Sequence, residues 1–339
     1  MSADDVKASL TELLARIDPA RDRELASELL ATAAGLAGDD PDPLDLKIAT
    51  AALKEMRTAF DTFAPYRHIP KVTIFGSART KTDDPLYAQA RAVAAALAGD
   101  GWMVVTGAGP GIMQAATEGA GRERSFGVNI RLPFEQGANP VIAHDVKLVS
   151  MKYFFTRKLM LIKESKAFVS LPGGFGTLDE TFELLTLTQT GKGVPVPIVL
   201  LDTPGDTYWA SAMAFMRTEL LRRGLIEASD LELVHVTSKV SDVVEHIARF
   251  YRNYDSLRFV GGELVLRMKK APNDAELSQL NERFGHLCAT GDIARSTPMK
   301  AEIDDGDRLE LARLRLTFAM RHYGELRQLV DALNDLLPD

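Results

Sequence analysis

Three glycine-rich turns, each directly after a short apolar segment, constrain the fold of this chain more than any other feature. They begin at Gly76, Gly107 and Gly173, and a stretch with helical spacing follows each of them. Repeated alternation of strand, turn and helix is typical of a parallel sheet with helices on both faces. The sequence therefore predicts an α/β fold built on a doubly wound parallel sheet.

The apolar segments of the central region predict the strands of this sheet. We expect strands at 72–76, 102–107, 125–130, 167–171, 197–202 and 232–236. Helices should fill the gaps, and one should begin at Asp84, because Pro85 then occupies the first helical turn, where proline is well tolerated. Residues 71–252 are therefore predicted to form a Rossmann-like domain.

The regions on either side of this domain have a different pattern of apolar residues. Residues 1–70 carry leucines at spacings that suit amphipathic helices, so we predict a helical N-terminal segment. Residues 253–339 predict a small α+β extension, with strands at 263–268 and 298–304 and a long leucine-rich helix over 307–337. Their apolar faces could cover the core or meet a second subunit.

The composition of the 339 residues excludes several classes of protein. Forty Lys and Arg against 47 Asp and Glu give a net charge of −7, so we expect no general affinity for nucleic acid or anionic membranes. Cys288 is the only cysteine, which rules out an intrachain disulfide and favours a reducing, cytoplasmic location. The acidic N-terminus and the lack of a long apolar run predict neither a signal peptide nor a membrane span.

The glycine-rich turns point to a phosphate ligand. In an open parallel sheet the ends of neighbouring strands form one crevice, so three such turns can converge on a single small molecule. Glycine lets backbone N–H groups approach an anion, and the helix that follows adds the positive end of its dipole. We therefore expect the central domain to bind the phosphate group of a small molecule.

The better-known phosphate motifs fit poorly. The glycines at 107, 109 and 111 depart from G-x-G-x-x-G, and Asn129 and Arg131 stand where a ribose-binding acid is expected, so the sequence argues against NAD. No P-loop sequence occurs. The histidines lack metal-ligand spacing, so we expect neither a metal nor a cofactor, and we expect the His235 ring to be a satisfied core group. The histidines are His68, His144, His235, His246, His286 and His322.

The stretch LPGGFGTLDE, residues 171–180, has two interpretations. Thr177 and Glu180 match a capping box, in which Thr177 caps the helix and Glu180 reaches back to the cap. That interpretation explains both residues without function. Alternatively, the Gly-Gly-x-Gly run is more permissive than a cap requires and follows a predicted buried strand at the ligand-binding edge. The residues alone leave both open.

Residues 172–180 resemble the P-G-G-x-G-T-x-x-E signature of the LONELY GUY (LOG) proteins. These are phosphoribohydrolases of nucleoside 5′-monophosphates, including cytokinin riboside monophosphates, and are often mislabelled lysine decarboxylases. The resemblance extends to residues 76–79, 107–113 and 157–158, and it is stronger to the longer bacterial branch than to the short plant enzymes. Where the plant type has Met-His-x-Arg-Lys, this chain has Phe-Phe-Thr-Arg-Lys at 154–158, which leaves the base preference open.

The resemblance implies hydrolysis of the N-glycosidic bond of AMP or a cytokinin riboside 5′-monophosphate. It implies Glu180 and Arg157 as catalytic residues, with Glu180 stabilising a ribose of oxocarbenium character. It also implies a homodimer or larger homo-oligomer. The substrate-binding residues that it implies are Gly76, Ser77, Arg79, Gly107, Gly109, Gly111, Met113, Lys158, Gly173, Gly174, Gly176 and Thr177.

Each of these assignments has a simpler alternative. Arg157 and Lys158 could form a solvated edge of a helix, Arg79 could be an ordinary exposed loop residue, and Met113 could belong to the core. The whole crevice could also bind without turnover. The protein would then be a nucleotide sensor or a carrier of a phosphorylated cofactor.

Overall fold

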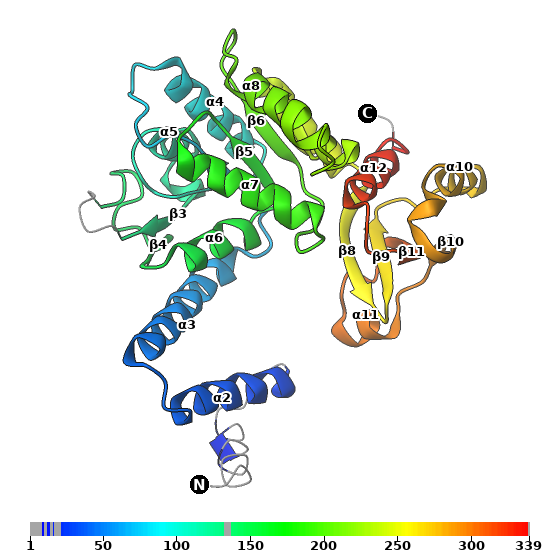
Figure 1. Ribbon diagram of the computed structural model, residues 1–339, viewed down its shortest axis with the longest axis horizontal. Coiled ribbons are helices and arrows are strands. Elements are labelled where there is room, and N and C mark those ends of the chain that lie inside the picture. Colours follow the sequence, from blue (N-terminus) through cyan, green and yellow to red (C-terminus); the bar gives the residue numbers. More distant parts are fainter. Residues whose placement is uncertain (1–8, 10–11, 14–15, 17–21, 132–136, 338–339) are drawn as a thin grey trace. The chain divides into compact units, whose positions relative to one another are not determined.

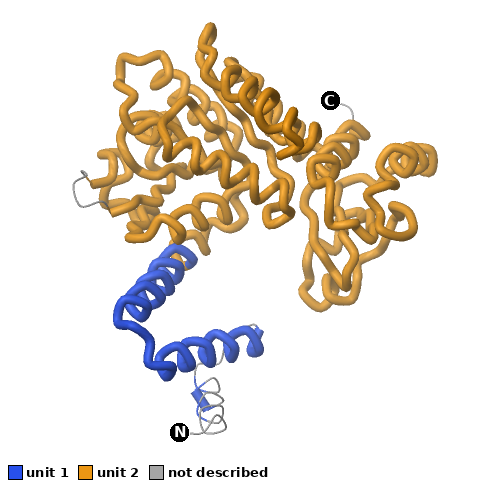
Figure 2. The backbone as a smooth tube through the Cα atoms, in the orientation of Figure 1, with its two compact units in different colours: residues 1–60 blue, residues 61–339 orange. Residues whose placement is uncertain are grey.

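The computed structural model describes residues 9, 12–13, 16, 22–131 and 137–337. The backbone divides into two compact units, residues 1–60 and 61–339 (Figure 2). In the first unit, α2 (Arg23–Gly38) begins where the Asp22 side chain accepts a hydrogen bond from the N–H of Leu25. Helix α3 (Pro43–Phe63) begins with proline in its first turn. The predicted helical N-terminal segment is therefore confirmed for residues 23–63, whereas most of residues 1–21 lies outside the described residues.

Seven parallel strands form the main sheet of the second unit, in the order β4-β3-β2-β1-β5-β6-β7. Strands β3, β4, β5 and β6 are labelled in Figure 1. The chain moves outward from β1 to β4 and then returns to the other side of β1. This reversal places a topological switch point between β1 and β5, which is the hallmark of a doubly wound sheet. The predicted Rossmann-like fold is confirmed. The strands are β1 (Lys71–Phe75), β2 (Met103–Thr106), β3 (Ser125–Ile130), β4 (Leu148–Met151), β5 (Ala167–Ser170), β6 (Ile198–Leu201) and β7 (Val234–Thr237).

Strand β4 was not predicted from the sequence. It is an edge strand in which Val149 and Met151 are buried, while Ser150 is exposed and Leu148 half-buried. The central strands are instead buried along their whole length, as expected where helices cover both faces. The weak apolar signal of an edge strand explains the omission.

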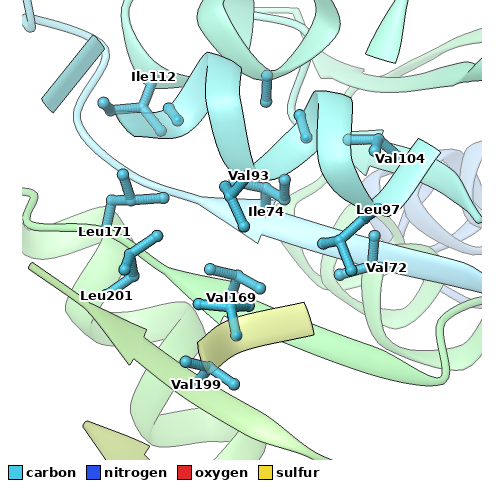
Figure 3. Close-up of a cluster of buried hydrophobic side chains, with 14 of the residues drawn as sticks. Val72, Ile74, Val93, Leu97, Val104, Ile112, Val169, Leu171, Val199 and Leu201 are labelled. Atoms are coloured by element: carbon cyan, nitrogen blue, oxygen red, sulfur yellow. The ribbon is translucent and has the colours of Figure 1, made fainter. Parts of the chain in front are cut away.

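Helices cover both faces of the sheet. On β6, Val199 and Leu201 pack into the cluster shown in Figure 3, whereas Leu200 faces the opposite cluster with Trp209. The helices are α4 (Pro85–Gly99), α5 (Ile112–Ala120), α6 (Phe154–Lys163), α7 (Phe175–Gln189), α8 (Tyr208–Phe215) and α9 (Val240–Phe250). Helix α4 begins after Asp84, whose carboxylate accepts from the N–H of Leu86, as predicted.

Short helical turns complete the second unit. They are η1 (Ala64–Tyr66), η2 (Arg122–Arg124), the π-helix η3 (Met216–Leu221), η4 (Ala228–Leu233) and η5 (Gly285–Leu287). Every described helix is too short or too polar to traverse a lipid bilayer.

A separate antiparallel sheet forms the predicted α+β extension, with strand order β10-β11-β9-β8. Its elements are β8 (Tyr254–Val260), β9 (Glu263–Met268), α10 (Asp274–Phe284), β10 (Cys288–Ser296), α11 (Lys300–Asp305), β11 (Ala312–Phe318) and α12 (Tyr323–Asn334). The strand predicted at 263–268 is confirmed. The predicted domain boundaries at residues 70 and 252 stay a prediction.

Two predictions in the extension are wrong. Residues 298–304 contain α11 instead of a strand, because the buried Glu302 side chain is hydrogen-bonded to Arg267 and to the Met299 N–H that precedes the helix. Residues 307–337 contain β11 before α12 instead of one long helix. Leu314 and Leu316 alternate with charged or polar residues along β11 and enter the core, a period of two that the leucine-rich composition masked.

The prediction for His235 is also wrong in part. Its side chain is 33% exposed and lies on the edge strand β7, so it is not a core residue. Its Nε2 atom is hydrogen-bonded to Asp242 at 2.9 Å, and its ring stacks on His246 with centroids 4.3 Å apart. The ring is therefore satisfied at the rim of the sheet.

Candidate active site

A cavity of about 770 Å³ opens at the carboxyl ends of β1, β2, β3 and β5, beside the switch point. All predicted site residues except Gly111 and Lys158 line it. They are Gly76, Ser77, Arg79, Gly107, Gly109, Met113, Arg157, Gly173, Gly174, Gly176, Thr177 and Glu180. The three glycine-rich turns therefore converge on one space, as the sequence predicted.

The turn between β5 and α7 exposes backbone N–H groups. Helix α7 begins at Phe175, and its first backbone hydrogen bond runs from the Leu178 N–H to the Gly174 carbonyl at 3.1 Å. The preceding amides of the first turn have no intrahelical acceptor. A side chain at Gly173 would collide with Oγ1 of Thr177 and come within 3.0 Å of the Ser77 nitrogen. The turn therefore requires glycine and offers an anion-binding helix N-terminus.

The capping-box interpretation of Thr177 and Glu180 is wrong. Gly174 precedes the helix and forms no side-chain cap, and Thr177 is already the third helical residue. The Glu180 carboxylate is instead bonded across the cavity wall to Arg157. Glu180 is therefore available to the site.

Arg157 is a buried, tightly held cation on α6. Its Nε atom donates to the carbonyl oxygen of Val128 at 2.9 Å, and its Nη1 atom donates to Oε1 of Glu180 at 3.0 Å. A Cβ at Gly107 would collide with Nη2 of Arg157 and lie 2.8 Å from the sulfur of Met113. The solvated-edge alternative is wrong for Arg157, and Gly107 is glycine because the guanidinium occupies that space.

The ion pair has an unusual electrostatic setting. The side chains of Arg157 and Glu180 are only 10% and 13% exposed. Burial raises the pKa of the Glu180 carboxyl above its ordinary value, and the nearby Arg157 charge works in the opposite direction. The carboxylate is therefore poorly hydrated and would gain from a positive charge appearing beside it.

Lys158 and Gly111 do not line the cavity but hold together the elements that surround it. Nζ of Lys158 pairs with Asp179 at 2.7 Å and with Glu183 at 2.8 Å, which joins α6 to α7 outside the cavity. Burial alone would lower the pKa of Lys158, but these two partners raise it. Gly111 has a φ of +66°, and a Cβ there would collide with the carbonyl oxygen of Ser77. It thus brings two of the turns into contact.

Several residues at the site were not predicted. Tyr208, Asn129, Phe154 and Phe175 also line the cavity. Asn139 donates from Nδ2 to the carbonyl of Ala108 at 3.2 Å, which holds the second turn. Tyr208 could have been found, because it opens the helix that follows β6 at the same sheet edge. Asn139 lies in an irregular segment and carries no comparable signal.

The described residues contain no group of three or more His, Cys, Asp or Glu side chains that could hold a metal ion. The polar groups that line the cavity are backbone amides, the Arg157–Glu180 pair, the Arg79 side chain and neutral side chains. Such a set can bind an anionic ligand and stabilise a cation next to it.

Comparisons with known proteins identify several that are similar to this chain. Residues 111–247 match the family model described as "Possible lysine decarboxylase". A cytokinin riboside 5′-monophosphate phosphoribohydrolase from Mycobacterium tuberculosis is 30% identical over 172 residues, which covers 50% of this chain and 90% of that protein. The protein of the same name from Mycobacterium marinum is 29% identical over 172 residues, with the same coverage. A solved structure, the molybdenum cofactor carrier protein from Chlamydomonas reinhardtii, is 22% identical and covers 53% of this chain and 97% of its own, with a TM-score of 0.37.

Proposed function

The chain belongs to the LONELY GUY (LOG) family, and we propose that it hydrolyses the N-glycosidic bond of a nucleoside 5′-monophosphate. The products would be a free base and ribose 5-phosphate, and the substrate would be AMP or a cytokinin riboside 5′-monophosphate. One observation carries the proposal: the buried Arg157–Glu180 pair and the free amides at the start of α7 line the same cavity.

The first step of the mechanism is capture of the 5′-phosphate. The amides of Gly174 and of the first turn of α7 would bind it, aided by the helix dipole and the Thr177 hydroxyl. Arg79 lines the same cavity and could add a charge-assisted contact. Anchoring the phosphate would place the ribose next to Glu180, one helical turn further along α7.

The second step is cleavage of the bond between ribose and base. The ribose gains positive, oxocarbenium-like character as the base departs. The ionised Glu180 would stabilise that charge and orient the attacking water, while Arg157 fixes the carboxylate through the 3.0 Å bond. Because the Arg157 and Glu180 side chains are largely buried, this interaction is stronger than at a protein surface.

The direct test is incubation with AMP, followed by chromatography for adenine and ribose 5-phosphate. We expect both products in equal amounts, with no requirement for an added metal or cofactor. A panel of GMP, CMP, UMP and a cytokinin riboside monophosphate would identify the preferred base. Tight AMP binding without base release would refute hydrolysis and support the sensor or carrier alternative.

We also propose that the protein is a homodimer or larger homo-oligomer. Phe155, Leu159 and Phe182 are 53%, 45% and 38% exposed and line a hollow between α6 and α7, close to the site. Grouped apolar side chains of this kind are typical of subunit interfaces. A second copy of this chain would cover them.

Phe155→Asp is expected to convert the assembly to a smaller species, because a carboxylate in an apolar interface loses its hydration. Sedimentation velocity at equal protein concentration would measure the change. Leu225→Asp is the matched control, since Leu225 is 64% exposed and lies outside this hollow. A monomeric wild type, or a Phe155→Asp variant of unchanged size, would contradict the proposed interface.

A further inference from the structure

Two carboxylates fix the start of α8 at the end of β6. Asp202 is 4% exposed, and its Oδ2 atom accepts from the Trp209 N–H at 3.1 Å. Oδ1 of Asp206 accepts from the N–H groups of Thr207 and Tyr208 at 2.6 and 3.1 Å. These bonds satisfy amides that a helix start leaves free. Tyr208 is therefore held at the sheet edge where the β5–α7 turn lies.

The Tyr208 hydroxyl reaches that turn. Its Oη atom donates to the carbonyl oxygen of Gly173 at 2.7 Å. The ring packs edge-on against Trp209, with centroids 4.9 Å apart and an interplanar angle of 89°. Trp209 itself is only 2% exposed. The hydroxyl thus comes from a ring that is anchored in the core.

Three consecutive carbonyl oxygens of the turn, those of residues 172–174, each accept a hydrogen bond. The Pro172 oxygen accepts from the Ser77 N–H at 3.3 Å, and the Gly174 oxygen accepts from the Leu178 N–H at 3.1 Å. Tyr208 holds the carbonyl between them, and its hydroxyl is the one donor of the three that belongs to a side chain. It is therefore the donor that a substitution can remove.

The direction of this carbonyl determines the direction of an amide. In a trans peptide the C=O and the following N–H point to opposite sides, so fixing the Gly173 carbonyl fixes the Gly174 N–H. Nothing lies within 4 Å of the place where a Gly174 Cβ would be, and glycine rotates easily, so sterics alone do not hold this peptide. A rotated peptide would present its oxygen to an anion in place of its N–H.

We infer that Tyr208 is a positioning residue of the phosphate site, acting through the Gly173–Gly174 peptide. This inference rests on the proposed function, since it assigns the 5′-phosphate to the turn. It adds a residue from α8, outside the glycine motifs, to the set that determines phosphate affinity. Tyr208 should therefore affect the affinity for the phosphate and not the rate of glycosidic bond cleavage.

The test compares Tyr208→Phe with a matched control, Tyr251→Phe. Oη of Tyr251 also donates to a backbone carbonyl, that of Lys166 at 2.6 Å, but Tyr251 does not line the cavity. We expect Tyr208→Phe to weaken ribose 5-phosphate binding about tenfold in calorimetry, the size of one hydrogen bond. KM for AMP should rise by a similar factor while kcat stays near the wild-type value. Tyr251→Phe should change neither.

The outcomes separate this inference from the hydrolase proposal. Wild-type affinity for ribose 5-phosphate in Tyr208→Phe would overturn the inference, whether or not AMP is cleaved. An equal loss of ribose 5-phosphate affinity in Tyr208→Phe and Tyr251→Phe would also overturn the inference, as would a fall in kcat of Tyr208→Phe at constant KM. If the wild type binds ribose 5-phosphate without cleaving any nucleotide, the hydrolase proposal fails and a selective loss in Tyr208→Phe still supports the positioning role. No binding of ribose 5-phosphate by the wild type would overturn the inference, whereas the hydrolase proposal would still be decided by the release of adenine from AMP.

Discussion

Glu180→Gln is expected to lower the turnover of AMP about a thousandfold while the protein stays folded. Opposite charges about 4 Å apart at an effective dielectric near 20 interact by about 4 kcal/mol, which is roughly a thousandfold in rate if it develops in the transition state. Glutamine keeps the shape of the side chain and an oxygen that Arg157 can still contact. Adenine release under saturating AMP would measure kcat.

The stability of this variant follows from the direction of the pKa shift. Burial raises the pKa of Glu180 in the folded state, so the fold favours the protonated form. A raised pKa contributes stability at low pH that is lost as the pH rises through the folded-state value. At neutral pH the ionised carboxylate is thus not a net source of stability on this account, and a neutral replacement should leave Tm close to that of the wild type.

Asp179→Asn is the matched control for Glu180→Gln. Asp179 is the preceding residue on α7, its side chain is 56% exposed, and it pairs with Lys158 outside the cavity. Its replacement should leave turnover nearly unchanged. Substantial turnover by Glu180→Gln would contradict the catalytic role, and a parallel loss in Asp179→Asn would point to damage of the helix instead.

The fold of the central domain was predictable because its signals are local. Buried strands such as β1 and β5 are apolar along their length, and a glycine-rich turn follows each of them. The edge strand β4 lacks such a pattern, because it needs only one partner strand and exposes Ser150. In β11 the alternation was present in the RLRL sequence of residues 313–316, but the surrounding leucines and charges also fit a helix.

The glycine-rich turns of the site were predictable because each follows a strand directly, whereas Arg157 was predicted from the family resemblance. Glu180 and the turn before it are fixed by their place after β5. Arg157 and Lys158 looked equivalent in the sequence, but consecutive residues of a helix point about 100° apart, so only one of them can face the cavity. Tyr208 and Asn139 act on turns 35 and 31 residues away along the chain, and that contact exists only in the folded protein.

Arg157→Ala is expected to lower kcat/KM roughly a hundredfold, since it removes charge-assisted hydrogen bonds worth about 3 kcal/mol together. The guanidinium contacts the Val128 carbonyl and Glu180 at once, which the single ammonium of lysine cannot reproduce with the same planar geometry. Arg157→Lys should therefore restore only part of the activity. Lys158→Ala, at the next position but outside the cavity, is the matched control.

The pH profile tests whether Arg157 acts through Glu180. Activity requires the ionised carboxylate, so it should fall as the pH drops through the raised pKa of Glu180. Arg157 is the main group that opposes this rise, so in Arg157→Ala the acid limb of kcat/KM should move to higher pH, because the carboxyl then holds its proton longer. Lys158→Ala should move the limb much less, since Lys158 lowers this pKa more weakly than Arg157 does. If the acid limb of Arg157→Ala stays at the wild-type pH, Arg157 does not act through the pKa of Glu180. Its role would then be confined to substrate binding.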